Sequence, residues 1–377
     1  MRGDQKSSGP APPGLSASVA VLARKPALKV LFTPVEDNNP YQRLLAGGLA
    51  AHGIDVTAGH LSPRKYLLGK QKVEQKIIHL HWLQPFYNEK SRSRSWLRSR
   101  AFVQAVKGLR AAGCRIVWTI HNLLPHDMIH PAIDVWVRRR MHLLADALIL
   151  HTTEARKEYV KMFGKRRGLF VVPHGVYAVS LVPMPDRAES REYFNLPKDD
   201  TIVALQFGMA REYKGFDRVA KALSSFSKHG AHAVFAGPGH AEKMDVTAAA
   251  ESGAASILSY YIPEYELPPL FAAADVLMLA YRNCTTSGLA LLGLGFGLPI
   301  VCSNMGPFPS MCSQKLGVIC TDPDDPDQLA QAVVKAKELA ADPGFTQARK
   351  KLLAESNWSR LAKATAKVYD YALKNNA

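Results

Sequence analysis

Gln206-Phe-Gly-Met-Ala-Arg211-Glu-Tyr-Lys214-Gly215-Phe-Asp217 joins an apolar run, residues 201–207, to an amphipathic one, residues 216–226. The first run is typical of a buried strand and the second of a helix. A glycine turn between them leaves backbone N–H groups unpaired at the helix start, where an anion binds well. Arg211 adds a planar guanidinium and Lys214 a point charge. Cations before a surface helix are often merely solvated, but together with Gly208 these residues predict a phosphate site.

A second candidate anion site follows about 70 residues later in the chain. Residues 274–281 are typical of a buried strand, residues 282–288 of a loop, and residues 289–296 of a helix that Gly297 ends. This helix is apolar on every side, so we expect it in the core with its N-terminus opening into a crevice. The residues before it offer three hydroxyls and a glycine, which are Thr285, Thr286, Ser287 and Gly288. They can cap the helix or hold an anion, and two such sites at strand ends predict one diphosphate between them.

The order of apolar runs predicts an α/β protein with two doubly wound domains and a ligand crevice between them. A chain of 377 residues is too long for one compact core. The expected division is a flexible arm (1–27), a first Rossmann-like domain (28–177), a linker (178–199), a second Rossmann-like domain (200–358) and a C-terminal helix (359–377). Prolines, charges and the lack of any periodicity mark the linker.

Positive charge is concentrated in the first half of the chain. Residues 1–170 carry 28 Lys and Arg against 11 Asp and Glu, while the whole chain has a net charge of +16. A positive electrostatic field of this kind attracts nucleic acid, an acidic substrate or an anionic membrane. Nucleic acid is not expected, because no helix-turn-helix, zinc-finger spacing or aromatic RNA-binding strand is present.

Residues 91–110 form the segment that could meet a membrane. Apolar and basic side chains alternate there with helical spacing, a pattern of interfacial helices and equally of a basic helix that covers a sheet. The residues expected at the membrane are Arg94, Trp96, Leu97, Arg98, Arg100 and Phe102.

Nothing in the sequence predicts a membrane-spanning helix or a structural metal site. No run of about 20 apolar residues occurs, and residues 14–23 lack the small-residue cleavage site of a signal peptide. The five cysteines have no paired metal spacing. His79 and His81 alternate on a strand without a third ligand beside them. We therefore expect a cytoplasmic protein without a metal.

Three histidines follow three expected strands of the first domain. These are His121, with Asn122 after it, His151 and His174. Each alone is usually a structural, hydrogen-bonded residue. Because ligands of α/β proteins bind at the carboxyl ends of strands, the three together predict a polar ring that faces the crevice.

In the order and spacing of its motifs, the chain resembles the GT-B nucleotide-sugar glycosyltransferases of the family-4 type. The resemblance covers most of residues 29–370 and implies a UDP- or GDP-sugar as the donor, with no cofactor. It implies that the phosphate ligands are Gly208, Arg211, Lys214 and residues 285–288. It adds as nucleotide-binding residues Gly237, Gly239, Tyr261, Ile262 and Glu266, and as crevice residues Asn122, His151, His174 and Tyr281. The segment from Trp358 onward is similar to the one that crosses back to the first domain in such enzymes.

The chain departs from that family at two positions. Retaining members carry two glutamates seven residues apart, and the matching positions here are Thr285 and Leu292. The pattern instead resembles a bacterial exopolysaccharide branch that includes the inverting β-mannosyltransferase of xanthan assembly. That branch implies a polyprenyl-diphosphate-linked glycan as acceptor and work at the inner face of the plasma membrane.

An inverting transferase needs a base from the first domain to deprotonate the acceptor hydroxyl. The candidates are His121, Asp127 and Asp37, in that order, with Asp127 oriented by His126 as an equal possibility to His121. Two other functions stay open: a retaining glycosyltransferase, and a nucleotide-sugar-binding protein without transferase activity.

Overall fold

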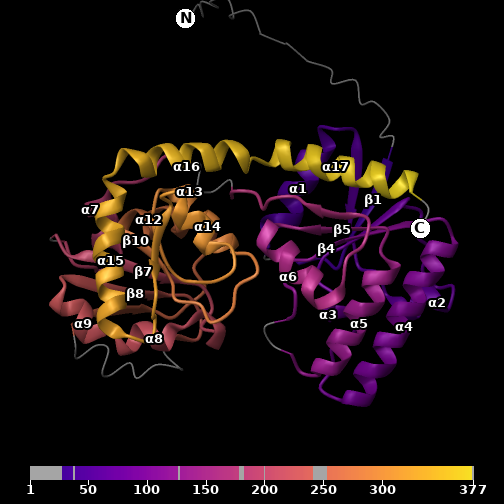
Figure 1. Cartoon of the computed structure of the whole chain (residues 1–377), viewed down its shortest axis with the longest axis horizontal. Coiled ribbons are helices and arrows are strands. Elements are labelled where there is room, and N and C mark those ends of the chain that lie inside the picture. Colours follow the sequence, from indigo (N-terminus) through magenta and orange to yellow (C-terminus); the bar gives the residue numbers. More distant parts are fainter. Residues whose placement is uncertain are drawn as a thin grey trace, which may run out of the picture.

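The computed structural model contains two six-stranded parallel sheets, as the sequence predicts (Figure 1). It describes residues 28–36, 39–125, 128–177, 182–198, 200–240 and 253–375. The first sheet has the order β2-β1-β3-β4-β5-β6, made by Leu28–Thr33 (β1), Ile54–Ala58 (β2), Ile77–Leu80 (β3), Arg115–Thr119 (β4), Ala147–Leu150 (β5) and Leu169–Val171 (β6). The second has the order β12-β11-β10-β7-β8-β9, made by Ile202–Phe207 (β7), Ala231–Ala236 (β8), Ala255–Leu258 (β9), Val276–Leu279 (β10), Ile300–Ser303 (β11) and Gly317–Cys320 (β12).

Helices cover both sheets. Those of the first domain are Pro40–Ala50 (α1), Pro63–Leu67 (α2), Gln84–Tyr87 (α3), Arg92–Ala111 (α4), Pro131–Leu144 (α5) and Thr153–Phe163 (α6). Those of the second are Arg187–Tyr193 (α7), Phe216–Lys221 (α8), Leu223–Lys228 (α9), Leu267–Ala273 (α12), Gly288–Phe296 (α13), Phe308–Ser313 (α14), Pro326–Ala340 (α15) and Pro343–Glu355 (α16), with 3-10 turns at Glu212–Lys214 (η2) and Glu264–Glu266 (η3). Residues 290–296 of α13 are all buried, which confirms the expectation from its composition.

The segment expected to be the linker contains a helix, α7, which the sequence pattern did not predict. Arg191 of α7 is 2% exposed and donates to the carboxylate of Asp275 at 2.8 Å. Asp275 also accepts from the backbone N–H of Val203 at 2.8 Å and pairs with Lys337. The helix is therefore held by a buried ion network rather than by an apolar stripe, and hydrophobic periodicity cannot detect such a helix.

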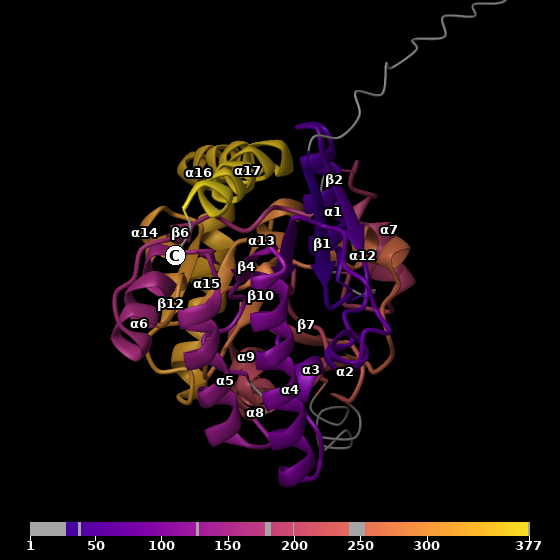
Figure 2. The ribbon, with the colours of Figure 1, turned by 90° about the vertical axis from the view of Figure 1, so that its right-hand side faces the viewer.

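The chain crosses between the domains twice, and the two crossings are bonded to each other. The backbone N–H of Val176 donates to Ser356 O at 3.0 Å, and the Trp358 indole donates to Val176 O at 2.7 Å. Helix α17, Trp358–Lys374, then packs against α1 of the first domain, as Figures 1 and 2 show at the top of the molecule. Its Leu361 and Tyr369 complete one of the apolar clusters of the first domain.

Gly215 illustrates how tightly the turn after β7 is built. It has φ +67°, and a Cβ there would overlap with the backbone oxygen of Ala280. Gly215→Ala is therefore expected to lower the free energy of unfolding by about 2–4 kcal/mol, from left-handed strain and overpacking together. Chemical denaturation measures this.

Gly53 provides the matched control for that substitution. It has a similar φ of +70°, but no other described residue has an atom within 4 Å of its Cβ position. Gly53→Ala should therefore cost only the strain, about 1–2 kcal/mol. Equal losses in the two variants would show that the contact with Ala280 costs nothing.

Candidate active site

A cleft of about 860 Å³ lies between the two domains. The first domain contributes Glu36, Arg43 and Tyr177 to its wall, and the second contributes Lys214 and Leu292 among others. A smaller hollow of about 170 Å³ opens beside it and shares Lys214, Gly288 and Leu289 with the cleft. The carboxyl ends of both sheets therefore border one continuous space, where α/β proteins bind ligands.

Lys214 carries a half-buried cation into this space. Its ammonium nitrogen lies directly over Gly208, where a Cβ would come within 2.5 Å of it. Burial, with a contribution from the charge of Arg211, lowers the pKa of Lys214 to about 8. Among the residues that the structure describes, no carboxylate pairs with this ammonium. Since an unpaired buried charge is costly, the site suits an anionic ligand.

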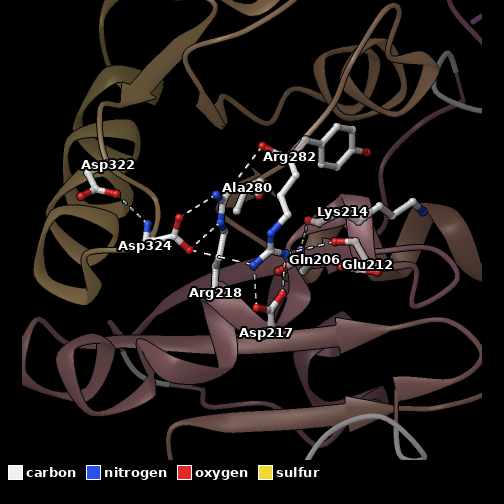
Figure 3. A network of polar contacts seen from close by, with 10 residues as sticks. Gln206, Glu212, Lys214, Asp217, Arg218, Ala280, Arg282, Asp322 and Asp324 are labelled. Carbon is white, nitrogen blue, oxygen red and sulfur yellow. Dashed lines mark hydrogen bonds and ion pairs between the residues drawn. The ribbon is translucent and has the colours of Figure 1, made fainter. Parts of the chain in front are cut away.

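Two arginines fix the turn that presents Lys214 (Figure 3). Arg218 donates to Ala280 O and Tyr281 O, each at 3.1 Å, and also pairs with Asp324. Arg282 binds both carboxylate oxygens of Asp217 at 2.7 Å. In Figure 3 the Lys214 side chain extends away from both guanidinium groups. The arginines therefore hold the backbone and leave the ammonium free to meet a ligand.

The three hydroxyls before α13 have three different roles. Ser287 caps the helix by accepting from the Ala290 N–H at 3.1 Å. Thr285 accepts from the Leu123 N–H of the first domain at 3.4 Å. The Thr286 hydroxyl is buried, has no hydrogen-bond partner among the described residues, and lines the small hollow with Lys214. The sequence predicted either a helix cap or an anion site. Ser287 is the cap, and the Thr286 hydroxyl remains available to an anion.

The remaining predicted donor residues are split between the cleft and its surroundings. Gly237, Tyr261 and Ile262 line the cleft, and Tyr281 lines the small hollow. Glu266 is 8% exposed and accepts from the Tyr260 hydroxyl at 2.8 Å, outside the lining of the cleft. Neither Gly239 nor the exposed Arg211 lines either space.

Leu292 lines the cleft, so an apolar side chain stands where the family pattern has its second glutamate. Of the residues that the structure describes, Glu36 and Glu264 are the ones that bring carboxylates to the lining. Glu264 lies 3.9 Å from Arg43 of the first domain, an exposed ion pair across the cleft. Neither glutamate is among the site residues predicted from the sequence.

The three histidines predicted at strand ends lie together in the structure, and His81 joins them. The His121 ring lies 5.2 Å from that of His151, which lies 5.3 Å from that of His174. His81 Nδ1 lies 3.2 Å from His121 Nε2, and His121 Nδ1 lies 3.3 Å from His151 Nε2. Burial lowers the pKa of all four histidines.

A backbone carbonyl determines which ring nitrogens donate in the row of hydrogen bonds that links His81, His121 and His151. His151 Nδ1 lies 2.9 Å from Val172 O, which can only accept, so His151 carries its proton on Nδ1. In neutral rings His121 then donates to His151, and His81 donates to His121. Both nitrogens of His121 are consequently engaged, and His81 Nε2 is buried with no hydrogen-bond partner in the described part of the chain.

The other predicted residues of the first domain are less constrained. Asn122 is half-buried beside His121. Asp127, His126 and Asp37 lie outside the described residues. The two alternative bases are therefore not placed.

The predicted membrane segment divides into a buried face and an exposed one. Phe102 is 0% exposed and packs into the core of the first domain, so its expected place at a membrane is wrong. Arg98 pairs with Glu89 and donates to Phe86 O. Trp96 and Leu97 are 40% and 70% exposed, and Arg94 and Arg100 are exposed. The segment both covers the sheet and presents a basic, partly apolar surface.

The described residues contain neither a metal site nor a membrane-spanning helix. They hold no group of three or more His, Cys, Asp or Glu placed to bind a metal ion. In the same part of the chain, none of the helices combines the length and the apolar character that crossing a bilayer requires.

The second domain matches a known family, and the chain has named relatives. Residues 201–338 match the family described as Glycosyl transferases group 1. The chain is 25% identical over 304 residues to the GDP-mannose:glycolipid 4-beta-D-mannosyltransferase of Xanthomonas campestris, covering 76% of this chain and 77% of that protein. It is 24% identical over 383 residues to the D-inositol 3-phosphate glycosyltransferase of Xylanimonas cellulosilytica, covering 95% and 85%.

Solved structures share the fold at low sequence identity. Sucrose-phosphate synthase from Thermosynechococcus elongatus superposes with a TM-score of 0.69 and 16% identity, over 91% of this chain and 98% of that one. Anabaena Alr3699/HepE in complex with UDP-glucose gives a TM-score of 0.66 and 13% identity, over 91% and 99%. Together, the matching family domain, the relatives and the lysine-bearing cleft between two parallel sheets support a GT-B glycosyltransferase related to the glycolipid mannosyltransferase of Xanthomonas.

Proposed function

We propose that this glycosyltransferase moves a hexose from a GDP- or UDP-sugar to a lipid-linked saccharide, with inversion at the anomeric carbon. The donor site is supported mainly by the half-buried Lys214 ammonium, which faces the start of α13 without a carboxylate partner among the described residues. A diphosphate there would gain an ion pair and backbone N–H donors together.

Lys214 and the start of α13 would stabilise the charge that develops on the leaving diphosphate. Preorganised donors of this kind supply much of the catalysis in group transfer. Since a cation and a helix N-terminus already face that position, we propose that transfer needs no metal ion. Unchanged transfer in the presence of EDTA would support this, and loss of transfer that Mg²⁺ restores would contradict it.

Inversion is supported by the residues that replace the two glutamates of the retaining pattern, Thr285 and Leu292. The relative that acts on a glycolipid also forms a 4-beta-D-mannosyl linkage, according to its name. NMR of the product's anomeric configuration separates inversion from retention. A nucleotide-sugar-binding protein without activity would bind donors and transfer nothing from any of them.

The base of an inverting reaction would come from the first domain. His121 Nε2 already accepts from His81, so His121 could take a proton only after that bond is released. This arrangement favours Asp127 or Asp37 as the base. Asp127→Asn and Asp37→Asn tested for transfer with donor binding intact would distinguish the two aspartates.

The donor is best identified with a panel of nucleotide sugars in a thermal-shift assay. A ligand that binds only the folded state raises stability by mass action, so the correct donor gives the largest shift. We expect a GDP- or UDP-sugar to give it. A panel without any shift would overturn the donor site.

We also propose that the enzyme acts at the cytoplasmic face of the plasma membrane, bound through α4. Arg94→Glu with Arg100→Glu should weaken sedimentation with anionic vesicles, because each basic residue near such a surface contributes about 1 kcal/mol. Lys350→Glu with Lys351→Glu makes the same charge change on α16 of the second domain and should leave binding unchanged. Equal binding to neutral and anionic vesicles would assign the basic surface to an acidic acceptor instead.

A further inference from the structure

His174, after strand β6, has one nitrogen held and one open. Its Nδ1 lies 2.8 Å from Gly175 O, which can only accept, so Nδ1 carries the proton of the neutral ring. Its Nε2 therefore presents a lone pair. No described residue bonds to Nε2, although the side chain is only 9% exposed.

The open nitrogen points to the N-terminus of α13. His174 Nε2 would lie 3.5 Å from a Cβ on Gly288, the first residue of that helix, and the Tyr177 hydroxyl 2.6 Å from it. Gly288 also borders the small hollow that holds Lys214. A side chain of the first domain thus reaches the anion site of the second.

The lone pair on His174 Nε2 is compatible with an empty anion site at the start of α13, but it would repel a bound anion. An anion at the helix start would place its oxygens, which only accept, close to another acceptor. The conflict ends if Nε2 gains a proton, because the imidazolium donates there and keeps its Nδ1–H bond to Gly175 O.

We propose that His174 takes up one proton from solvent when the donor diphosphate binds, and that its Nε2–H then donates to that diphosphate. This inference rests on the proposed donor site. It makes His174 a ligand of the leaving group that is charged only in the complex.

The groups around His174 allow this change. The rings that face it are those of Tyr41 from α1 at 5.0 Å, His151 at 5.3 Å, Tyr177 at 5.6 Å and Trp358 at 6.2 Å. Burial lowers the pKa of His174 to about 4, so the ring is neutral in the empty site near pH 7. A nearby diphosphate raises the pKa of an imidazole, and proton uptake follows between the two values.

The pH dependence of binding distinguishes His174 from Lys214. Between the free and bound pKa of His174, donor affinity should fall about tenfold for each pH unit of increase. Lys214, with a pKa of about 8, is already protonated at pH 6.5 and adds proton uptake only at higher pH. Uptake at pH 6.5 therefore reports on histidine.

Calorimetry at pH 6.5 in buffers with different heats of ionisation counts the protons. The probes are GDP-mannose and UDP-glucose, whose diphosphate diesters do not themselves titrate near this pH. We expect uptake of about one proton by the unaltered enzyme. His174→Gln, which keeps an amide donor but cannot titrate, should bind with no uptake, and His60→Gln, an exposed histidine, should behave as the unaltered enzyme.

Binding without proton uptake, or uptake that persists in His174→Gln, would overturn the role of His174 and leave the donor site standing. Failure of both probes to bind would overturn the donor site and this inference together. If His174→Gln does not fold, ¹⁵N NMR of the histidine rings in the unaltered enzyme decides. The Nε2 signal of His174 must then change from the unprotonated to the protonated form when the donor is added.

Discussion

Lys214→Met is expected to lower turnover by on the order of 100-fold, the size typical of removing one preorganised charge from a transition state. Methionine keeps much of the stem that lies over Gly208 but has no charge for the leaving diphosphate. Steady-state kinetics with the identified donor measures the loss.

The same substitution should raise the free energy of unfolding. Burial lowers the pKa of Lys214 from 10.5 to about 8, so folding at pH 7 confines a charge that prefers water. Removing that charge should stabilise the empty enzyme by about 1–3 kcal/mol. A loss of activity with a gain in stability is the signature of a residue kept for its ligand, and a purely structural lysine would not give it.

Lys221→Met is the matched control for this experiment. Lys221 is exposed on α8, close in sequence to Lys214. Its loss should change neither turnover nor stability. Near-normal transfer by Lys214→Met would overturn the assignment of the ammonium to the diphosphate.

Acid should unfold the enzyme well before its carboxylates are protonated. Burial lowers the pKa of His79 and His151 to about 3 and that of His174 to about 4. The pKa values of His81 and His121 lie well below 6.5 as well. The unfolded chain binds protons below pH 6.5 that the folded chain cannot, so stability present above pH 6.5 is lost as the pH falls.

The five histidines should act together. Each is expected to lower the free energy of unfolding by about 1.4 kcal/mol for each pH unit below 6.5. The five together therefore lower it by about 7 kcal/mol per pH unit. Because domains are typically stable by about 5–15 kcal/mol, we expect unfolding between about pH 5 and pH 6. Fluorescence of the buried Trp118 and circular dichroism would follow it.

A substitution within the cluster tests the cause of this acid sensitivity. His79→Gln should reduce the pH dependence by about one proton, whereas the exposed His60→Gln should not change it. A protein that stays folded to pH 4 would show that the buried histidines gain protons without cost.

The sequence predicted most strands well because their signal is local. Residues 201–207 and 274–281, both typical of buried strands, contain the observed strands β7 and β10, since each is a short apolar run beside turn residues. Helix α7 was missed because its stability comes from Asp275, distant in the chain. Phe102 was assigned to the wrong surface because periodicity shows that a helix has an apolar face without showing what covers it.

The candidate site shows the same contrast between local features, which the sequence predicts, and contacts between distant residues, which it does not. The turn at Lys214 and the hydroxyls before α13 could be found from sequence, because glycines, cations and caps act within a few residues. The pairing of His121 with His81 and His151 could not, because it depends on how three strands align side by side. The tautomers follow from a single carbonyl, Val172 O, which no sequence pattern marks.

The return of α17 to the first domain also bears on the order in which the chain folds during synthesis. One face of the first sheet is covered by α1 together with Leu361, Val368 and Tyr369 of α17. Those residues leave the ribosome after the whole of the second domain. Since domains fold as units while they are made, the second domain can be complete first, and the domain that is translated first must wait, with an apolar face uncovered, for the last helix.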